Sequence, residues 1–272
     1  MPSMDERETG YYDRTYEHAA DALYATIRQE AFGEDIGQFS WLTADEYRRF
    51  FRWSGIEHSS HVVEIASGSG GPALFMAQET GCRATGVDIH QAGVDAANTQ
   101  AEALGLADRA RFVHADTRKP LPFGDATFDA LTCIDSFNHL YEREQVLREW
   151  HRVLQPNARM LFTDPITVTG PIRREEMIVR SGSMGEFVFT PPGVDEQLLR
   201  DAGFVDIRVE DVTQNMDDVA SRWRAARELH RDELDRIEGA AESAAFQRFL
   251  EVVAALARER RLSRLAFVAA KP

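Results

Sequence analysis

The amino-acid sequence predicts an α/β protein built on a doubly wound, mainly parallel sheet. Two observations support this. Short apolar segments typical of strands alternate with segments of helical periodicity from residue 61 onward, and a glycine-rich turn follows the first strand. Strands and helices that alternate at this spacing form βαβ crossovers, which place the strands parallel. Ligands of such sheets bind beyond the carboxyl ends of the strands, where the strand order reverses. The residues that directly follow each strand are therefore the candidates for function.

Each element is predicted from its hydrophobic period and from the turn residues at its ends. Strands are expected at residues 61–66, 83–88, 110–114, 128–134, 159–163, 205–212 and 262–270. Helices are expected at residues 16–30, 43–53, 72–80, 92–104, 142–154 and 195–202, and through most of 217–260 with a weak point near Gly239. Thr43 is the expected N-cap of the second helix, because Glu46 follows three residues later.

Three segments outside the alternating pattern are expected to form a helical cap. Residues 1–55 precede the first strand and are predicted as an N-terminal cap or lid, which leaves residues 56–272 as the core. Within the core, the pattern loosens at about 165–192, which is rich in proline and arginine, and at 217–260, which is almost wholly helical. Both segments are predicted as insertions that belong to the cap.

The composition argues against several classes of partner. The 272 residues include 31 Lys+Arg against 45 Asp+Glu, a formal charge of -14, whereas surfaces that bind nucleic acid or anionic lipid are usually basic. Neither nucleic acid nor a membrane is therefore expected as a partner. The two cysteines are too few for a disulfide framework or a cysteine zinc cluster, and no metal is expected. Without a signal-like or membrane-spanning apolar run, a cytoplasmic location is expected.

The first candidate site is the glycine-rich turn after the first strand. Gly68 and Gly70 let a ligand approach the backbone closely, because a Cβ would intrude. Together with Ala73 they also satisfy the Gly-x-Gly-x-x-Ala dinucleotide fingerprint. A nicotinamide-dependent oxidoreductase is therefore an alternative. Glu64 inside the strand favours a cationic cofactor instead, because an acid beneath the turn stabilises positive charge.

Further polar residues follow the next three strands. Asp88 ends the second strand, where its carboxylate can accept both hydroxyls of a ribose, a feature that adenosyl and nicotinamide cofactors share. Asp116, followed by Thr117, can accept from an adenine amino group or can simply cap a turn. Asp135 and His139 follow the fourth strand, where the reacting end of the cofactor would point.

These motifs together resemble the class I S-adenosylmethionine-dependent methyltransferases. The resemblance covers roughly residues 32–165 and rests on Glu64, Gly68, Gly70, Asp88, Asp116, Phe128-Asp129 and the 152–156 segment Arg-Val-Leu-Gln-Pro. Within that superfamily the chain is similar to the phosphoethanolamine, sarcosine/dimethylglycine and rebeccamycin-type sugar O-methyltransferase group. That likeness rests on Phe32-Gly-Glu34, on the 135–139 segment and on Thr163-Asp164.

The resemblance implies a Rossmann-like sheet of seven strands, the last one antiparallel, with a helical cap. It implies that the chain binds S-adenosylmethionine, releases S-adenosylhomocysteine, and methylates an oxygen or nitrogen of a small molecule. The expected acceptor is a metabolite or a natural product of secondary metabolism. The cofactor-binding residues that it implies are Gln38, Glu64, Ala66, Gly68, Gly70, Asp88, Ile89, Asp116, Thr117 and Cys133. A protein of this fold that binds the same cofactor but catalyses a different reaction is a second alternative.

The resemblance also implies a catalytic group after the fourth strand. His139 is the expected base or substrate-positioning residue, since histidine is the side chain whose charge changes near neutral pH. Asp164 or Asp135 would orient it, and Tyr12 or Tyr16 would close over the site. The methyl acceptor is the expected partner, and the chain is expected to be a monomer or a homodimer.

Two positions depart from the family pattern. Ala66 stands at the first glycine of the usual acid-x-Gly-x-Gly-x-Gly loop, which is acceptable if its φ stays negative. Asn157 replaces a glycine before the fifth strand, and asparagine also accepts left-handed geometry. The phosphate-binding side chains of phosphobase methyltransferases have no clear counterparts in residues 165–192, so phosphoethanolamine is not expected as the substrate.

Overall fold

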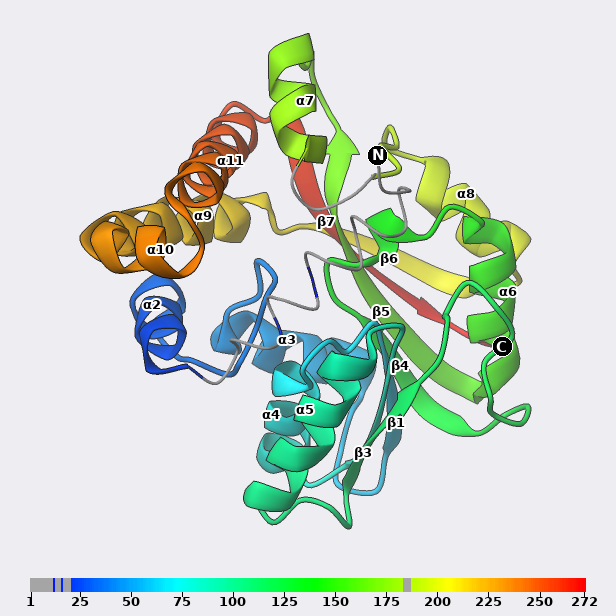
Figure 1. Ribbon diagram of the computed structural model, residues 1–272. Coiled ribbons are helices and arrows are strands. Elements are labelled where there is room, and N and C mark those ends of the chain that lie inside the picture. Colours follow the sequence, from blue (N-terminus) through cyan, green and yellow to red (C-terminus); the bar gives the residue numbers. More distant parts are fainter. Residues whose placement is uncertain (1–11, 13–15, 17–20, 183–186) are drawn as a thin grey trace.

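The structure, a computed structural model, describes residue 12, residue 16 and residues 21–182 and 187–272 (Figure 1). The strands are β1 His61–Ile65, β2 Arg83–Asp88, β3 Ala110–His114, β4 Phe128–Cys133, β5 Leu154–Val168, β6 Val205–Asp211 and β7 Leu262–Ala270. The helices are α2 Ala22–Phe32, α3 Ala44–Ser54, α4 Gly71–Thr80, α5 Gln91–Ala103, the 3-10 turn η1 Phe137–His139, α6 Arg143–Val153, α7 Arg174–Gly182, α8 Val194–Asp201, α9 Thr213–Leu229, α10 Arg231–Ile237 and α11 Ala240–Arg258. None of the helices in these ranges is long and apolar enough to cross a membrane.

The strands form one seven-stranded sheet in the order β3-β2-β1-β4-β5-β7-β6 among the described residues. Strands β1 to β5 pair in parallel, and β7 pairs antiparallel with both β5 and β6. This confirms the predicted fold, including the antiparallel last strand. The strand order reverses between β1 and β4, which identifies the edge where a ligand of such a sheet binds.

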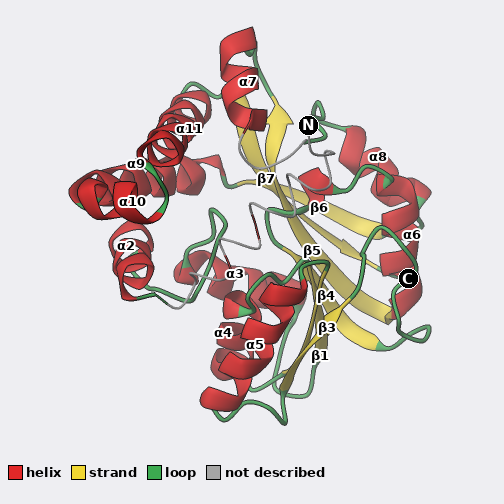
Figure 2. Cartoon of the chain, viewed as in Figure 1, coloured by secondary structure: helices red, strands yellow, loops and turns green. Residues whose placement is uncertain are grey.

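Different helices cover the two faces of the sheet, as Figure 2 shows. Adjacent residues of a strand point to opposite faces, so Val62 packs with the apolar side chains of α3, α4 and α5, whereas Val63 packs with those of α6 and α8. Because both faces are buried, β1 is mostly apolar after His61, and Glu64 is its one fully enclosed polar residue.

A separate apolar cluster lies among α2, α9, α10 and α11. Residues from opposite ends of the chain meet in it, among them Ile27 of α2, Val219 of α9 and Leu250 of α11. Trp41, in the loop before α3, belongs to the same cluster and lies against Trp223, with ring centroids 6.1 Å apart. The cluster therefore joins the N-terminal segment to the C-terminal helices.

Two helical predictions need correction. Tyr16 is helical as predicted, but Asp21 is extended, with φ -67° and ψ 139°, so the expected helix does not run on from residue 16 and α2 begins at Ala22. Residues 17–20 of that prediction lie outside the described residues. The expected helix at 217–260 begins earlier, at Thr213, and is divided into α9, α10 and α11. The first break is at His230 and the second at Gly239, whose φ of 87° a helix cannot contain.

The fifth strand is longer than its hydrophobic pattern predicts. Only residues 159–163 were expected as strand, but β5 has 15 residues. At its carboxyl end the reason is its antiparallel partner, because the pairing with β7 continues from Arg159 opposite Ala270 to Val168 opposite Leu262. At its amino end Leu154 pairs with Phe128 of β4. The segment predicted as a lid at 165–192 therefore starts as a strand and then contains α7.

Candidate active site

A cavity of about 370 Å³ lies at the carboxyl ends of the central strands. It opens at the point between β1 and β4 where the strand order reverses. Its wall consists of the residues that follow β1, β2, β3 and β4, together with the loop before α3 and two N-terminal tyrosines. These residues are Tyr12, Tyr16, Gly37, Phe39, Ser40, Glu64, Ala66, Ser67, Gly68, Ser69, Pro72, Asp88, Ile89, His90, Asp116, Thr117, Arg118, Ile134, Asp135, Ser136, His139 and Leu140.

The glycine turn forms the floor of this cavity. A Cβ on Gly68 would lie 2.9 Å from the Tyr16 hydroxyl, whereas a Cβ on Gly70 would lie 2.6 Å from the Cβ of Ala97. The absence of a Cβ at Gly68 therefore leaves room for the Tyr16 ring in the cavity wall. Its absence at Gly70 lets the turn pack against α5. Gly70 itself does not belong to the described cavity wall.

The two departures from the family pattern have different outcomes. The condition under which alanine is easily accepted at position 66, a negative φ, is not met, because the φ of Ala66 is 56°. The turn therefore keeps the left-handed geometry of the glycine it replaces and carries the steric cost of a Cβ there. Asn157 has a φ of 66°, so it adopts the left-handed geometry that was expected of it.

Asp88 joins the end of β2 to the glycine turn. Its carboxylate accepts the Gly68 amide at 2.7 Å and the His90 amide at 2.8 Å, one on each oxygen. A carboxylate offers about four lone-pair positions, so each oxygen can still accept one hydroxyl. Burial raises the pKa of the Asp88 carboxyl, while the two amides act in the opposite direction. Asp88 thus fixes the shape of the turn and presents acceptors to the cavity.

Glu64 lies beneath the turn as a buried acid with incomplete hydrogen bonding. Its Oε1 accepts the Tyr47 hydroxyl at 3.3 Å, and its Oε2 has no hydrogen-bond partner in the described part of the chain. Burial raises the pKa of Glu64 to about 8. A cation placed in the cavity would favour the ionised carboxylate and supply the missing partner. The site therefore fits a cofactor with a positive charge at this end.

The residues after β2 and β3 form the opposite end of the cavity. Ile89 and Thr117, two of the predicted cofactor-binding residues, contribute to its wall. Asp116 also lies in the wall, but its carboxylate already accepts the Nε–H of Arg118 at 2.9 Å and the Arg118 amide at 3.0 Å. Any bond to an adenine amino group would have to use the lone pairs that remain.

Besides Gly70, three predicted site residues lie outside the described wall of this cavity. Gln38 is fully buried, accepts the Ile36 amide at 2.8 Å, and donates to the Glu34 carbonyl at 3.2 Å, so it shapes its own loop. Cys133 is fully buried in the apolar cluster on the face of the sheet that α6 and α8 cover. Asp164 is also fully buried, and its carboxylate accepts from Arg143 at 2.8 Å and from the Ile166 amide at 3.0 Å.

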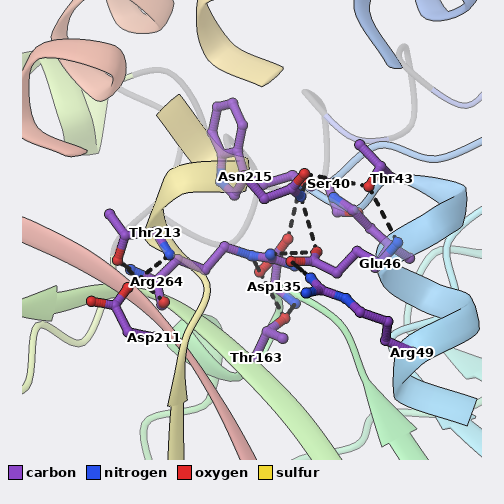
Figure 3. Close-up of polar contacts among 12 residues, drawn as sticks. Ser40, Thr43, Glu46, Arg49, Asp135, Thr163, Asp211, Thr213, Asn215 and Arg264 are labelled. Carbon is purple, nitrogen blue, oxygen red and sulfur yellow. Dashed lines mark hydrogen bonds and ion pairs between the residues drawn. The ribbon is translucent and has the colours of Figure 1, made fainter. Parts of the chain in front are cut away.

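Asp135 is the centre of a buried network that joins four segments of the chain (Figure 3). Its Oδ1 accepts from the Thr163 hydroxyl and from Arg264 Nε, both at 2.7 Å, and its Oδ2 accepts the Trp41 amide at 2.9 Å. Arg264 also donates through Nη1 to Glu46 Oε2 at 2.6 Å. Asp135 adopts a φ of 52°, an unusual value for a residue other than glycine. The network fixes the loop that leads from β4 to η1.

His139 stands at the end of η1, on the same loop. Its Nε2 lies 3.2 Å from the hydroxyl of Tyr12, and its ring lies 4.8 Å from the ring of Phe187. It also belongs to the wall of a second, smaller cavity of about 40 Å³. Tyr12, Phe39, Ser40, Asp135 and His139 border both cavities, so these residues separate them.

Known proteins of similar sequence and structure place the chain in a family. Residues 63–162 match the family described as a methyltransferase domain. The chain is 31% identical over 202 residues to 27-O-demethylrifamycin SV methyltransferase of Amycolatopsis mediterranei, covering 70% of this chain and 74% of that protein. It is 30% identical over 210 residues to sarcosine/dimethylglycine N-methyltransferase of Halorhodospira halochloris, covering 76% of this chain and 70% of that protein.

The same fold occurs in the cyclopropane synthase MmaA2 from Mycobacterium tuberculosis. The two structures align over 99% of each chain, with a TM-score of 0.80 and 14% sequence identity. At that identity the likeness concerns the fold alone, and the two relatives above identify the family. The chain therefore belongs to the class I S-adenosylmethionine-dependent methyltransferases, and S-adenosylmethionine is its cofactor.

Proposed function

We propose that the chain transfers the methyl group of S-adenosylmethionine to an oxygen or nitrogen of a small molecule. The observation that carries this proposal is the position of His139, on the border between the cofactor cavity and the smaller cavity. A base at that border can reach a nucleophile that enters from the smaller cavity. The rifamycin relative supports a metabolite or natural product as the acceptor.

The order of the strands suggests how the cofactor lies. Glu64 of β1 would face its ammonium or sulfonium charge, Asp88 at the end of β2 would accept the ribose hydroxyls, and Asp116 after β3 would lie at the adenine. Because β3, β2, β1 and β4 are neighbours in that order, the reacting end would lie toward β4 and the loop that follows it. His139 is on that loop.

The chain's own residues would do three things once S-adenosylmethionine supplies an electrophilic methyl group. His139 would accept the proton that a hydroxyl or ammonium acceptor must lose. Tyr12 and Tyr16 would cover the cavity and exclude water, which also holds the reactants in place. Asp135, through its network, would fix the loop that carries His139. The helical cluster of α2, α9, α10 and α11 would form the cap over the acceptor.

Replacement of His139 tests this proposal. The assay measures formation of S-adenosylhomocysteine from S-adenosylmethionine with a panel of phenols, hydroxy acids and amino acids. Wild-type protein should turn over at least one acceptor. His139→Ala should lower kcat/KM for that acceptor by roughly 100-fold to 10,000-fold, because it removes a general base. Binding of S-adenosylhomocysteine should change less than about threefold, since the cofactor contacts of Glu64 and Asp88 remain.

His58→Ala is the matched control, because His58 is exposed and lies before β1, outside the described cavity wall. Its activity should equal that of the wild type. Cofactor binding without methyl transfer to any acceptor would favour a non-methylating reaction on the same cofactor. Hydride transfer with a nicotinamide cofactor would favour the oxidoreductase alternative. Either result would contradict the proposed function.

A further inference from the structure

Arg180 of α7 is a buried cation in the wall of the smaller cavity. Its side chain is 2% exposed, and its guanidinium carbon lies 4.7 Å from the ring centroid of Phe187 and 5.1 Å from that of Phe249. Its Nε and Nη1 are buried and have no hydrogen-bond partner in the residues that the structure describes. The two aromatic rings therefore attract the charge without satisfying its donors.

The other buried arginines nearby are paired. Arg143 donates to Asp164 at 2.8 Å and to Asp195 at 2.7 Å, and Arg264 donates to Glu46 and Asp135. The two carboxylates that act electrostatically on Arg180, those of Asp164 and Asp135, are thus already paired with Arg143 and Arg264. A buried charge without a partner costs folding free energy. Burial lowers the pKa of Arg180 to about 10, so its guanidinium remains cationic near neutral pH.

We propose that Arg180 binds a carboxylate of the methyl acceptor and that this contact selects anionic substrates. The inference rests on the proposed function, because it assigns the smaller cavity to the acceptor. A cavity of about 40 Å³ has room for a group the size of a carboxylate. Such an anion would supply the missing partners of Nε and Nη1 through charge-assisted hydrogen bonds.

The remaining wall of the cavity indicates the rest of the acceptor. It is largely aromatic, with Trp41, Trp223, Phe246 and Phe249 beside Arg180, and it includes His139. An acceptor whose carboxylate occupies the smaller cavity at Arg180 would therefore pass along these rings and present its nucleophile at His139, which borders both cavities. The structure thus points to an aromatic or apolar hydroxy acid or amino acid.

Arg180 could instead bind the carboxylate of the cofactor itself. Its position argues against this, because it borders the smaller cavity and does not belong to the described wall of the larger one. Binding of S-adenosylhomocysteine to an Arg180→Met variant separates the two assignments. If Arg180 serves the acceptor, the affinity should stay within about threefold of the wild type. A loss of 10-fold or more would assign Arg180 to the cofactor and overturn the proposal.

The acceptor test uses matched pairs of a carboxylate and its neutral amide. Benzoate and benzamide, and phenylacetate and phenylacetamide, are titrated calorimetrically into protein saturated with S-adenosylhomocysteine. In at least one pair the wild type should bind the carboxylate 10-fold or more tightly than the amide. Arg180→Met should lower the carboxylate affinity by roughly 10-fold to 100-fold and leave amide affinity unchanged. Arg174→Met is the control, because Arg174 is an exposed residue of the same helix.

Thermal unfolding distinguishes this role from a structural one. Arg180→Met removes a buried charge whose Nε and Nη1 have no partner among the described residues, and it keeps an apolar chain among the rings, so the melting temperature should rise or stay unchanged. A marked fall, or equal binding of carboxylate and amide in every pair, would overturn the proposal. If the carboxylates bind as expected while no acceptor is methylated, the anion site stands and the proposed function fails.

Discussion

Replacement of Asp88 by alanine is expected to raise the dissociation constant for S-adenosylhomocysteine at least about 100-fold. Two effects contribute. The variant loses the carboxylate that is proposed to accept the ribose hydroxyls, and hydrogen bonds to a charged group are worth about 1.5–3 kcal/mol each. It also releases the amides of Gly68 and His90, so the turn that forms the cavity floor loses its support. Calorimetric titration of the variant and the wild type measures the difference.

Two further variants make the Asp88 result specific. Asp88→Asn keeps one oxygen acceptor and should show a smaller loss of affinity. Asp108→Ala changes an exposed aspartate in the turn before β3 and should bind as the wild type does. Circular dichroism would verify that Asp88→Ala is folded. A change of less than threefold in a folded Asp88→Ala variant would contradict the assignment of the ribose to Asp88.

Replacement of Arg264 by methionine is expected to lower the free energy of unfolding by about 3–5 kcal/mol, because it leaves buried charges uncompensated. Arg264 is fully buried and is ion-paired with both Glu46 and Asp135 (Figure 3). Urea unfolding measures the loss. Arg248→Met is the control, since Arg248 pairs with Glu251 on an exposed helix surface, and such pairs contribute about 1 kcal/mol or less.

The pH dependence of the free energy of unfolding of Arg264→Met shows whether uncompensated buried charge causes the loss of stability. Burial raises the pKa of Glu46 above its usual value even though Arg264 opposes this, so without Arg264 the pKa should rise further. An acid whose pKa is higher in the folded state stabilises the fold at low pH and loses that contribution as the pH rises. The stability deficit of Arg264→Met should therefore be larger at pH 8 than at pH 5. A deficit that does not change with pH would indicate lost packing instead.

The sequence predicts the sheet well because its signals are local. Strands β1 to β4 are short segments that alternate with helices along the sequence, and the turn after β1 carries its glycines in the sequence itself. The positive φ of Ala66 has no such signal, because alanine avoids that conformation and only the surrounding turn imposes it. The length of β5 depends in the same way on β7, a strand about 100 residues further along the chain.

The site is less predictable because it depends on where side chains point. Asp164 follows Thr163 in the sequence, yet Thr163 bonds to Asp135 whereas Asp164 bonds to Arg143, since successive strand residues face opposite sides. Arg264 and Glu46 are 218 positions apart and nothing in the sequence pairs them. An arginine within the apolar final strand was the available sign of a buried partner. For Arg180, only the fold shows that it is buried and that its Nε and Nη1 lack a partner within the described part of the chain.

A crystal structure of the protein with S-adenosylhomocysteine is the most direct test of the account. It should show the ribose hydroxyls at Asp88, the adenine near Asp116 and Thr117, and the sulfur toward His139. The face of the sulfur that carries the methyl group in S-adenosylmethionine should point to the smaller cavity bordered by Arg180. An adenosyl group in the opposite orientation, or a sulfur that faces away from His139, would contradict the account.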